Sequence, residues 1–261
     1  MKTKLSRVIN IEKNPLTDAA FITQCKKTLD DNGALILPGF LNKTAIESIN
    51  NEAESQKHLA YYTKNNHNIY LTRNDERFKN NHVRNRMMTS SKGCITTDQI
   101  PSGSALNILY ESPDFKTFLC QVLGEKQLYK YADNLSSINL HYADEGQELG
   151  WHFDNSSFAI TLLIQSPEAG GEFEYVKDAR NADAGEMGFE NVKKVLNGTI
   201  TPEKLSINAG DLVLFRGRNS MHRVTPVMGD TTRKLVVLAY NSAPEISLSE
   251  SARMTFFGRL G

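Results

Sequence analysis

Two histidines and one aspartate have the residue types and the spacing that a metal site needs. His152 and Asp154 lie two residues apart in the segment GWHFD, and His222 follows much later in the chain. Side chains two residues apart in a strand point to the same face, so His152 and Asp154 can converge on one point. Two histidines and a carboxylate form the facial triad that binds iron(II) and leaves three coordination positions open. The alternative is a hydrogen-bonded polar pair and a structural histidine.

The open positions suit a 2-oxo acid, which takes two of them, and O2, which takes the third. Arg233 begins a later strand-like segment, and its guanidinium could pair with the distal carboxylate of a 2-oxo diacid. Tyr142 is expected on a neighbouring strand and could donate a hydroxyl to the same carboxylate. The alternatives are a surface ion pair for Arg233 and a core aromatic role for Tyr142.

The elements that must position these residues differ between the two halves of the chain. Periodicity predicts helices over 18–31, 43–58 and 114–123 and a short strand over 34–37. Residues 61–101 are polar and rich in asparagine, with a strand-like segment at 68–71. We expect mobile loops there, and 64–91 is a candidate lid over a substrate.

Strands dominate the second half. The pattern predicts strands over 136–143, 158–164, 171–176, 211–215, 220–227 and 234–240, and a surface helix over 190–196. Closely spaced strands with turn residues between them are typical of a β-sandwich or barrel. We therefore expect a mainly β fold with flanking α-helices in a single domain, 1–261. Residues 1–135 would form a helical flank and lid region, 136–245 the β core and 246–261 a C-terminal extension.

Composition excludes several functional classes. The 261 residues include 30 Lys and Arg against 30 Asp and Glu, so charge gives no reason to expect nucleic acid or an anionic membrane as a partner. No apolar run is long enough to span a membrane, and no apolar segment follows the basic N-terminus as in a secretory signal. The three cysteines are scattered, as in a reducing compartment. We expect a cytoplasmic protein and leave its oligomeric state open.

Residues 139–240 resemble the core of iron(II)/2-oxoglutarate dioxygenases of the prolyl-hydroxylase-like superfamily. The resemblance implies a double-stranded β-helix, the jelly roll also called cupin-like, with N-terminal helices. It also implies iron(II) bound by His152, Asp154 and His222, 2-oxoglutarate bound by Arg233 and Tyr142, O2 as oxidant and ascorbate as a support of activity. The matching motifs are Tyr142-x3-Gly146-x5-His152-x-Asp154, GGEF at 170–173, AGDLVLF at 209–215, His222-x-Val224-x-Pro226-Val227 and Arg233.

Two further segments, GWHFDNSSF and GGEFEY, resemble a bacterial group that includes free-lysine halogenases and their hydroxylase relatives. The resemblance implies a free amino acid as substrate, with lysine the first candidate. Related halogenases carry Gly or Ala where Asp154 stands, so Asp154 implies hydroxylation of an unactivated C–H bond with release of succinate and CO2. The alternatives are the same chemistry on another small molecule or a protein side chain, and a non-enzymatic cupin-like metal-binding protein.

A free amino acid would need a cation for its carboxylate and anions for its amines. Arg84 or Arg86 could bind the carboxylate. Asp133, Asn155 or Glu172 could face the amines. For each of these five residues the alternative is a solvated or structural role.

Overall fold

The computed structural model describes residues 4–261. The helices are α1 (Ala19–Asn32), α2 (Lys43–Gln56), α3 (Ala105–Tyr110), α4 (Pro113–Leu123), α5 (Phe189–Leu196) and α6 (Glu250–Phe257). The strands are β1 (Ala34–Leu37), β2 (Tyr61–Asn68), β3 (Met87–Ile95), β4 (Ile138–Ala143), β5 (Leu149–His152), β6 (Ala159–Gln165), β7 (Ala169–Gly170), β8 (Phe173–Val176), β9 (Glu203–Leu205), β10 (Leu212–Phe215), β11 (Met221–Val224), β12 (Val227–Met228) and β13 (Arg233–Leu238).

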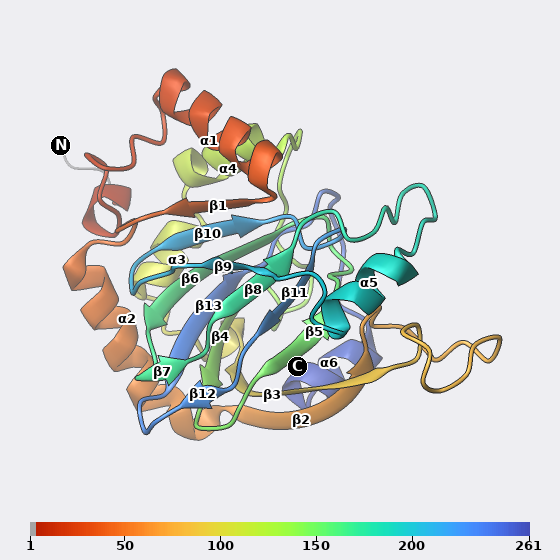
Figure 1. The fold of residues 1–261 in the computed structure, drawn as a ribbon. Coiled ribbons are helices and arrows are strands. Elements are labelled where there is room, and N and C mark those ends of the chain that lie inside the picture. Colours follow the sequence, from red (N-terminus) through yellow and green to blue (C-terminus); the bar gives the residue numbers. More distant parts are fainter. Residues whose placement is uncertain (1–3) are drawn as a thin grey trace.

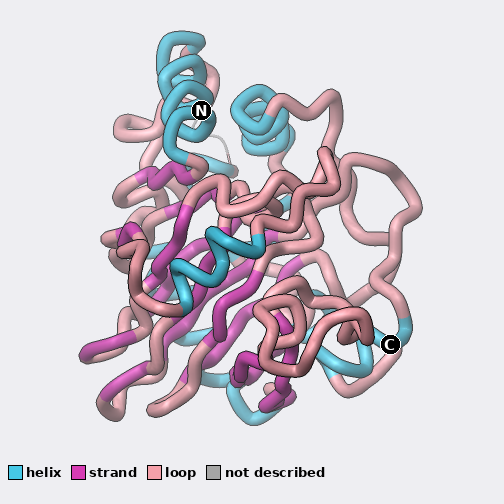
Figure 2. The backbone as a smooth tube through the Cα atoms, turned by 45° about the vertical axis from the view of Figure 1, so that its right-hand side comes forward, coloured by secondary structure: helices cyan, strands magenta, loops and turns pink. Residues whose placement is uncertain are grey.

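One antiparallel sheet forms the body of the molecule. Its strands follow the order β1-β10-β6-β13-β4-β3-β5-β11-β8-β9, with β2 paired to β3, while β7 and β12 form a separate short ribbon. The sheet curls into a half-barrel, so that its two ends face each other (Figure 1). Figure 2 shows the strands at the centre of this arrangement and most helices at its periphery. The expected jelly-roll core with flanking helices is confirmed.

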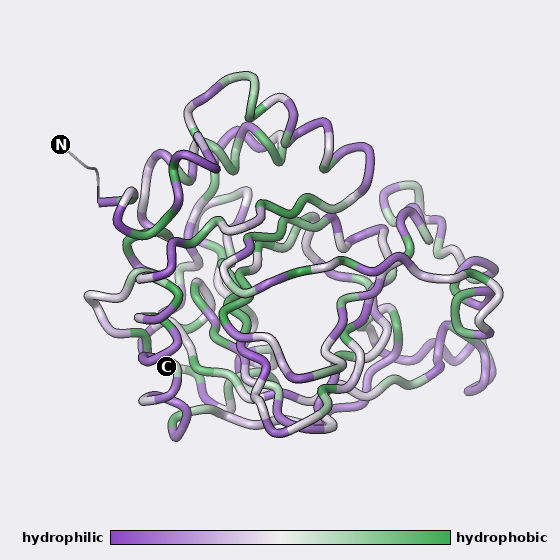
Figure 3. The backbone as a smooth tube through the Cα atoms, turned by 60° about the vertical axis from the view of Figure 1, so that its left-hand side comes forward, coloured by the Kyte–Doolittle hydropathy of each residue, from purple (hydrophilic) through white to green (hydrophobic). Residues whose placement is uncertain are grey.

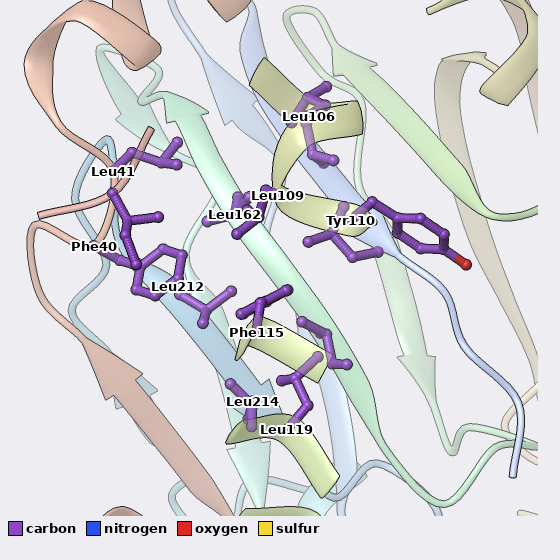
Figure 4. Close-up of a cluster of buried hydrophobic side chains, with 14 of the residues drawn as sticks. Phe40, Leu41, Leu106, Leu109, Tyr110, Phe115, Leu119, Leu162, Leu212 and Leu214 are labelled. Atoms are coloured by element: carbon purple, nitrogen blue, oxygen red, sulfur yellow. The ribbon is translucent and has the colours of Figure 1, made fainter. Parts of the chain in front are cut away.

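The main hydrophobic core lies between the sheet and the N-terminal helices. Leu162 of β6 and Leu212 and Leu214 of β10 point toward Phe115 and Leu119 of α4, and all five side chains are buried (Figure 4). Helices α1 and α4 lie side by side beyond β1, and α2 packs on β6. The helices alternate between hydrophobic and hydrophilic residues in Figure 3, as expected where one helix face is buried.

Local sequence signals account for most element boundaries. The Asp18 carboxylate accepts a hydrogen bond from the Phe21 backbone at 2.7 Å and so caps α1. Gly33 ends α1 in the left-handed region, at φ +72°, where a side chain would be strained. Helix α4 begins with the same type of cap at Ser112, followed by Pro113. These boundaries match the sequence-based expectation to within one or two residues.

The polar region between residues 61 and 101 differs from that expectation. Its strand is not at 68–71; it is β2, which ends at Asn68 and forms a long hairpin with β3. Lys64 and Ser91, the ends of the candidate lid, are direct partners in this hairpin. Polar side chains gave a weak strand signal because β2 is an edge strand with mostly exposed residues.

Within residues 4–261, no helix combines the length and the apolar character that a membrane span requires.

Candidate metal centre

Two neighbouring strands and one turn bring the three predicted ligands together. His152 ends β5 and lies directly opposite His222 of β11, so both imidazoles emerge on the same face of the sheet. Asp154 lies two residues beyond β5, and its backbone N–H donates to the Gly217 carbonyl at 3.0 Å. The candidate ligand atoms of the three residues lie within 4.8 Å of one another. One cation could therefore contact all three side chains.

Both imidazoles are oriented for metal binding. Nδ1 of His152 lies 2.8 Å from the Gly150 carbonyl oxygen, and Nδ1 of His222 lies 3.0 Å from the Ser220 carbonyl oxygen. A carbonyl can only accept, so each Nδ1 carries the proton and each Nε2 presents a lone pair. The two Nε2 atoms lie 3.7 Å and 3.5 Å from Oδ1 of Asp154. A backbone partner on Nδ1 is the usual support of a histidine that ligates a metal.

The protonation states also suit a cation. Burial, and then the neighbouring His222, lower the pKa of His152 to about 3, so this imidazole is neutral at pH 7. Burial alone would raise the pKa of Asp154, but His222 and His152 lower it, so the carboxylate is ionised. Oδ2 of Asp154 is buried and accepts no hydrogen bond from any residue in 4–261. Two imidazoles with Nδ1 on a backbone carbonyl, together with an ionised carboxylate that has an unsatisfied oxygen, fit the donor set of non-haem iron(II).

Two residues that the sequence motifs did not identify hold the Asp154 turn in place. Gly217 packs against the carboxylate, because a Cβ at this position would lie 1.9 Å from Oδ2 of Asp154. Arg180 stacks over Phe153, with its guanidinium carbon 4.2 Å from the ring centroid, and donates to the Asp154 carbonyl at 3.3 Å. Both contacts join segments distant in the chain, so no local pattern could have revealed them.

A cavity of about 280 Å³ opens beside the three ligands, and strands from the middle of the sheet line it, including β3, β4, β5, β11 and β13. Arg233 lines it from β13, and its guanidinium forms no hydrogen bond or ion pair with any residue in 4–261. Gly171 lies against the aliphatic part of Arg233, where a Cβ would come within 2.9 Å of Cδ. Burial lowers the pKa of Arg233 to about 10, so the guanidinium remains charged at pH 7. A buried, unpaired guanidinium is suited to a carboxylate ligand.

Tyr142 does not line this cavity, and its side chain points away from the place where the sequence predicted that it would bind the cosubstrate. Side chains alternate along β4, so His141 and Ala143 face the cavity while Tyr142 points into the main hydrophobic core. Its side chain is fully buried, and its hydroxyl donates to the Ala53 carbonyl of α2 at 2.7 Å. Strand alternation reverses the face of each successive residue, so the tyrosine belongs to the helix-facing side.

Neither arginine proposed for a substrate carboxylate reaches the cavity. Arg84 lies 5.5 Å from the Tyr70 ring centroid and donates to the Arg73 carbonyl at 3.0 Å. Arg86 is exposed in the loop between β2 and β3. Both positions lie outside the cavity lining. A role of either arginine in binding a substrate carboxylate therefore stays a prediction that this cavity does not support.

The three residues proposed for substrate amines are also elsewhere. The Asp133 carboxylate accepts backbone hydrogen bonds, including one from Leu248 at 2.9 Å, and thereby shapes a turn. Asn155 is exposed just beyond the ligand turn. Glu172 is exposed and pairs with Lys204 at 2.6 Å. None of the three lines the cavity, and their contact with substrate amines stays a prediction.

Other polar residues occupy the cavity wall in their place. Lys92 lines it from β3, His141 from β4, and Tyr131 and Glu148 from the adjoining loops. His141 could have been found in the sequence by assigning the other face of β4 to the cavity. Lys92 lies in a polar segment of weak strand character, which gave no signal.

Comparison with known proteins is consistent with this geometry. A family model described as "HalD: Halogenase D" matches residues 17–255. No curated protein sequence matches the chain.

Several solved structures share the fold. An oxidoreductase of the 2OG-Fe(II) oxygenase family from Burkholderia pseudomallei is 12% identical, with a TM-score of 0.55, over 87% of this chain and 93% of that one. The α-ketoglutarate-dependent epimerase SnoN from nogalamycin biosynthesis is 12% identical, with a TM-score of 0.58, over 85% and 81%. A Pseudomonas putida prolyl-4-hydroxylase is 13% identical, with a TM-score of 0.52, over 83% and 96%. The chain therefore belongs to the Halogenase D family and has the fold of the 2OG-Fe(II) oxygenases.

Proposed function

We propose that the chain is a 2-oxoglutarate-dependent iron(II) oxygenase that hydroxylates an unactivated C–H bond of a free amino acid, with lysine as the first candidate. One observation carries the proposal. Two imidazole Nε2 lone pairs and an ionised carboxylate converge beside a cavity that also holds an unpaired guanidinium. A simple binding module has no need for this combination.

We assign the metal to His152, Asp154 and His222, and the distal carboxylate of 2-oxoglutarate to Arg233. When bound, iron(II) supplies activation of O2 coupled to decarboxylation of 2-oxoglutarate, which gives succinate, CO2 and a hydroxylated product. The three side chains would hold the cation at the cavity wall. Arg233 orients the diacid, and the cavity wall excludes water from the reacting centre.

The size of the cavity supports a small substrate. About 280 Å³ is slightly below the roughly 300–1,000 Å³ that is typical of small-molecule sites. A protein side chain would need an open groove for its flanking backbone. The resemblance to lysine halogenases and their hydroxylase relatives supports an amino acid, and the cavity contains groups of both charges, Lys92 and Glu148.

Halogenation is the second candidate, because the family model carries the description Halogenase D. Asp154 opposes it. A halide needs a free position on the metal, and in this chain the Asp154 carboxylate, which packs against Gly217, would occupy that position. We therefore favour hydroxylation.

The test has two stages. Anaerobic addition of iron(II) and then 2-oxoglutarate should produce a weak visible absorbance band, and its absence in iron-loaded protein would favour a binding role. Aerobic reactions with each free amino acid, with ascorbate, should then release succinate and yield a product heavier by one oxygen atom in mass spectrometry. Turnover with peptides and not with free amino acids would contradict the substrate class, and a chloride-dependent chlorinated product would establish the second candidate.

A further inference from the structure

Lys92 lies on the strand that separates the metal ligands from Arg233. The sheet order β13-β4-β3-β5-β11 places Arg233 first, His141 second, Lys92 third, and then His152 and His222. The side chains of all five residues line the same cavity. A molecule that is held between the metal and Arg233 would leave Lys92 beside it on the cavity wall.

The Lys92 ammonium has hydrogen-bonding capacity that the protein does not use. Its Nζ lies 3.3 Å from Nδ1 and 3.2 Å from Nε2 of His141, and it has no ion pair with any residue of the described chain. Burial, and then Lys92 itself, lower the pKa of His141 well below 6.5, so this ring is neutral. A neutral imidazole offers one lone pair, whereas an ammonium has three N–H donors. At least two donors therefore remain for a ligand.

The charges in the cavity indicate what that ligand is. Iron(II), the Asp154 carboxylate, the Arg233 guanidinium and dianionic 2-oxoglutarate sum to zero formal charge. Burial lowers the pKa of Lys92, because a positive charge away from bulk water is costly without a partner, so an anionic ligand beside Nζ would stabilise the ammonium form. Among the described residues that line the cavity, two have a carboxylate, Asp154 and Glu148. No ion pair links Glu148 to Lys92. One unpaired cation and one unpaired anion suit a zwitterion.

We propose that Lys92, supported by His141, binds the carboxylate of the organic substrate, and that Glu148 faces an amine of the same molecule. This assignment rests on the proposed oxygenase function and refines it. The substrate is then an amino acid whose carboxylate lies over β3 and whose reacting carbon extends toward the metal strands. Lys92 acts in binding and specificity and takes no part in the oxidation step.

Binding measurements on the intact protein test the assignment separately from activity. Anaerobic iron(II) protein is titrated with 2-oxoglutarate by visible absorbance, and the iron(II)·2-oxoglutarate complex is then titrated by calorimetry with free amino acids, L-lysine first. The variants are Lys92→Met, which keeps the stem and removes the charge, and Lys92→Arg, which restores the charge. Lys64→Met, at an exposed position of the neighbouring strand β2, is the matched control.

We expect Lys92→Met to weaken the binding of the amino acid roughly 10- to 100-fold, the range for loss of a charge-assisted hydrogen bond. The affinity for 2-oxoglutarate should change less than about threefold. Lys92→Arg should recover most of the loss, and Lys64→Met should resemble the wild type. An amino acid amide, which lacks the carboxylate, should bind wild type and Lys92→Met equally.

Two results would overturn the assignment and leave the oxygenase proposal standing. If Lys92→Met weakens 2-oxoglutarate and leaves the amino acid unaffected, Lys92 serves the cosubstrate; a 2-oxo monoacid would then report which carboxylate is involved. If neither affinity changes in a variant whose thermal unfolding is intact, Lys92 binds no carboxylate. A wild-type protein that binds iron(II) but no 2-oxoglutarate would contradict the oxygenase proposal itself and the assignment with it.

Discussion

Replacing Gly217 with alanine should test the placement of the Asp154 carboxylate more directly than replacing Asp154 itself. The added Cβ would lie 1.9 Å from Oδ2, 2.6 Å from Cγ and 3.0 Å from Cβ of Asp154. The backbone of Gly217 does not have a positive φ, so alanine adds no backbone strain at this position. The penalty must therefore come from the collision with Asp154.

The magnitude follows from these contacts. Overpacking a well-packed site costs about 1–3 kcal/mol of unfolding free energy. In an Asp154→Gly background the collision is removed, and Gly217→Ala should be neutral or stabilise by up to about 1 kcal/mol through the lower entropy of the unfolded chain. The coupling energy between the two positions should then be about 1–3 kcal/mol.

The assay is urea unfolding of the four proteins of this double-mutant cycle, in the presence of a metal chelator so that metal binding does not contribute. A parallel anaerobic titration with iron(II) should show weaker binding in Gly217→Ala, because the carboxylate must rotate away from the two imidazoles. An equal cost of Gly217→Ala in both backgrounds would refute the placement of Asp154 against Gly217. So would an unchanged affinity for iron(II).

Three further predictions concern the cavity and its walls. Arg233→Met should weaken the binding of 2-oxoglutarate roughly 10- to 100-fold in the absorbance titration, as expected for loss of a charge-assisted bond. The control is Lys234→Met, which removes a buried amine bonded to Asn50 and Glu54 on the opposite side of β13 and should lower stability without changing that affinity. Equal effects of the two variants on the affinity would contradict the assignment of Arg233. Tyr142→Phe removes the hydrogen bond to Ala53 and should therefore lower the unfolding free energy by about 0.5–1.5 kcal/mol, while 2-oxoglutarate binds normally. A large loss of affinity for 2-oxoglutarate would restore Tyr142 as a cosubstrate ligand. Burial lowers the pKa of His141 well below 6.5, so the unfolded chain binds more protons below that pH, and the unfolding free energy should fall as the pH decreases from 6.5. His141→Gln should reduce the slope of unfolding free energy against pH by up to about 1.4 kcal/mol per pH unit. An unchanged slope would show that His141 is not held neutral.

Much of this structure could be predicted from the sequence because its signals are local. Caps such as Asp18 and stop residues such as Gly33 defined α1, and runs of β-branched and apolar residues defined β6, β10 and β13. The spacing of His152 and Asp154 placed two candidate ligands on one strand face. The later position of His222 between strand-like segments supplied the third.

The wall of the cavity could not be predicted in the same way. The sequence suggested Tyr142, Arg84 and Asp133 because each carries a suitable functional group, but a side chain acts only where its strand face or turn directs it. Tyr142 was assigned to the wrong side of β4, and its neighbour His141 occupies the cavity instead. The edge position of β2 hid the hairpin that brings Lys92 beside the metal strands.

The sequence by itself determined the types of chemical group and the main helices and strands, because residue type, periodicity and capping act over a few neighbouring residues. The tertiary structure decided which groups share the cavity. That choice depends on the register of His152 against His222 and on the contact of Gly217 with Asp154. It also depends on the order in which β3 joins β4 to β5. These are contacts between distant segments, formed only when the strands of the sheet assemble, and no short window of sequence contains them.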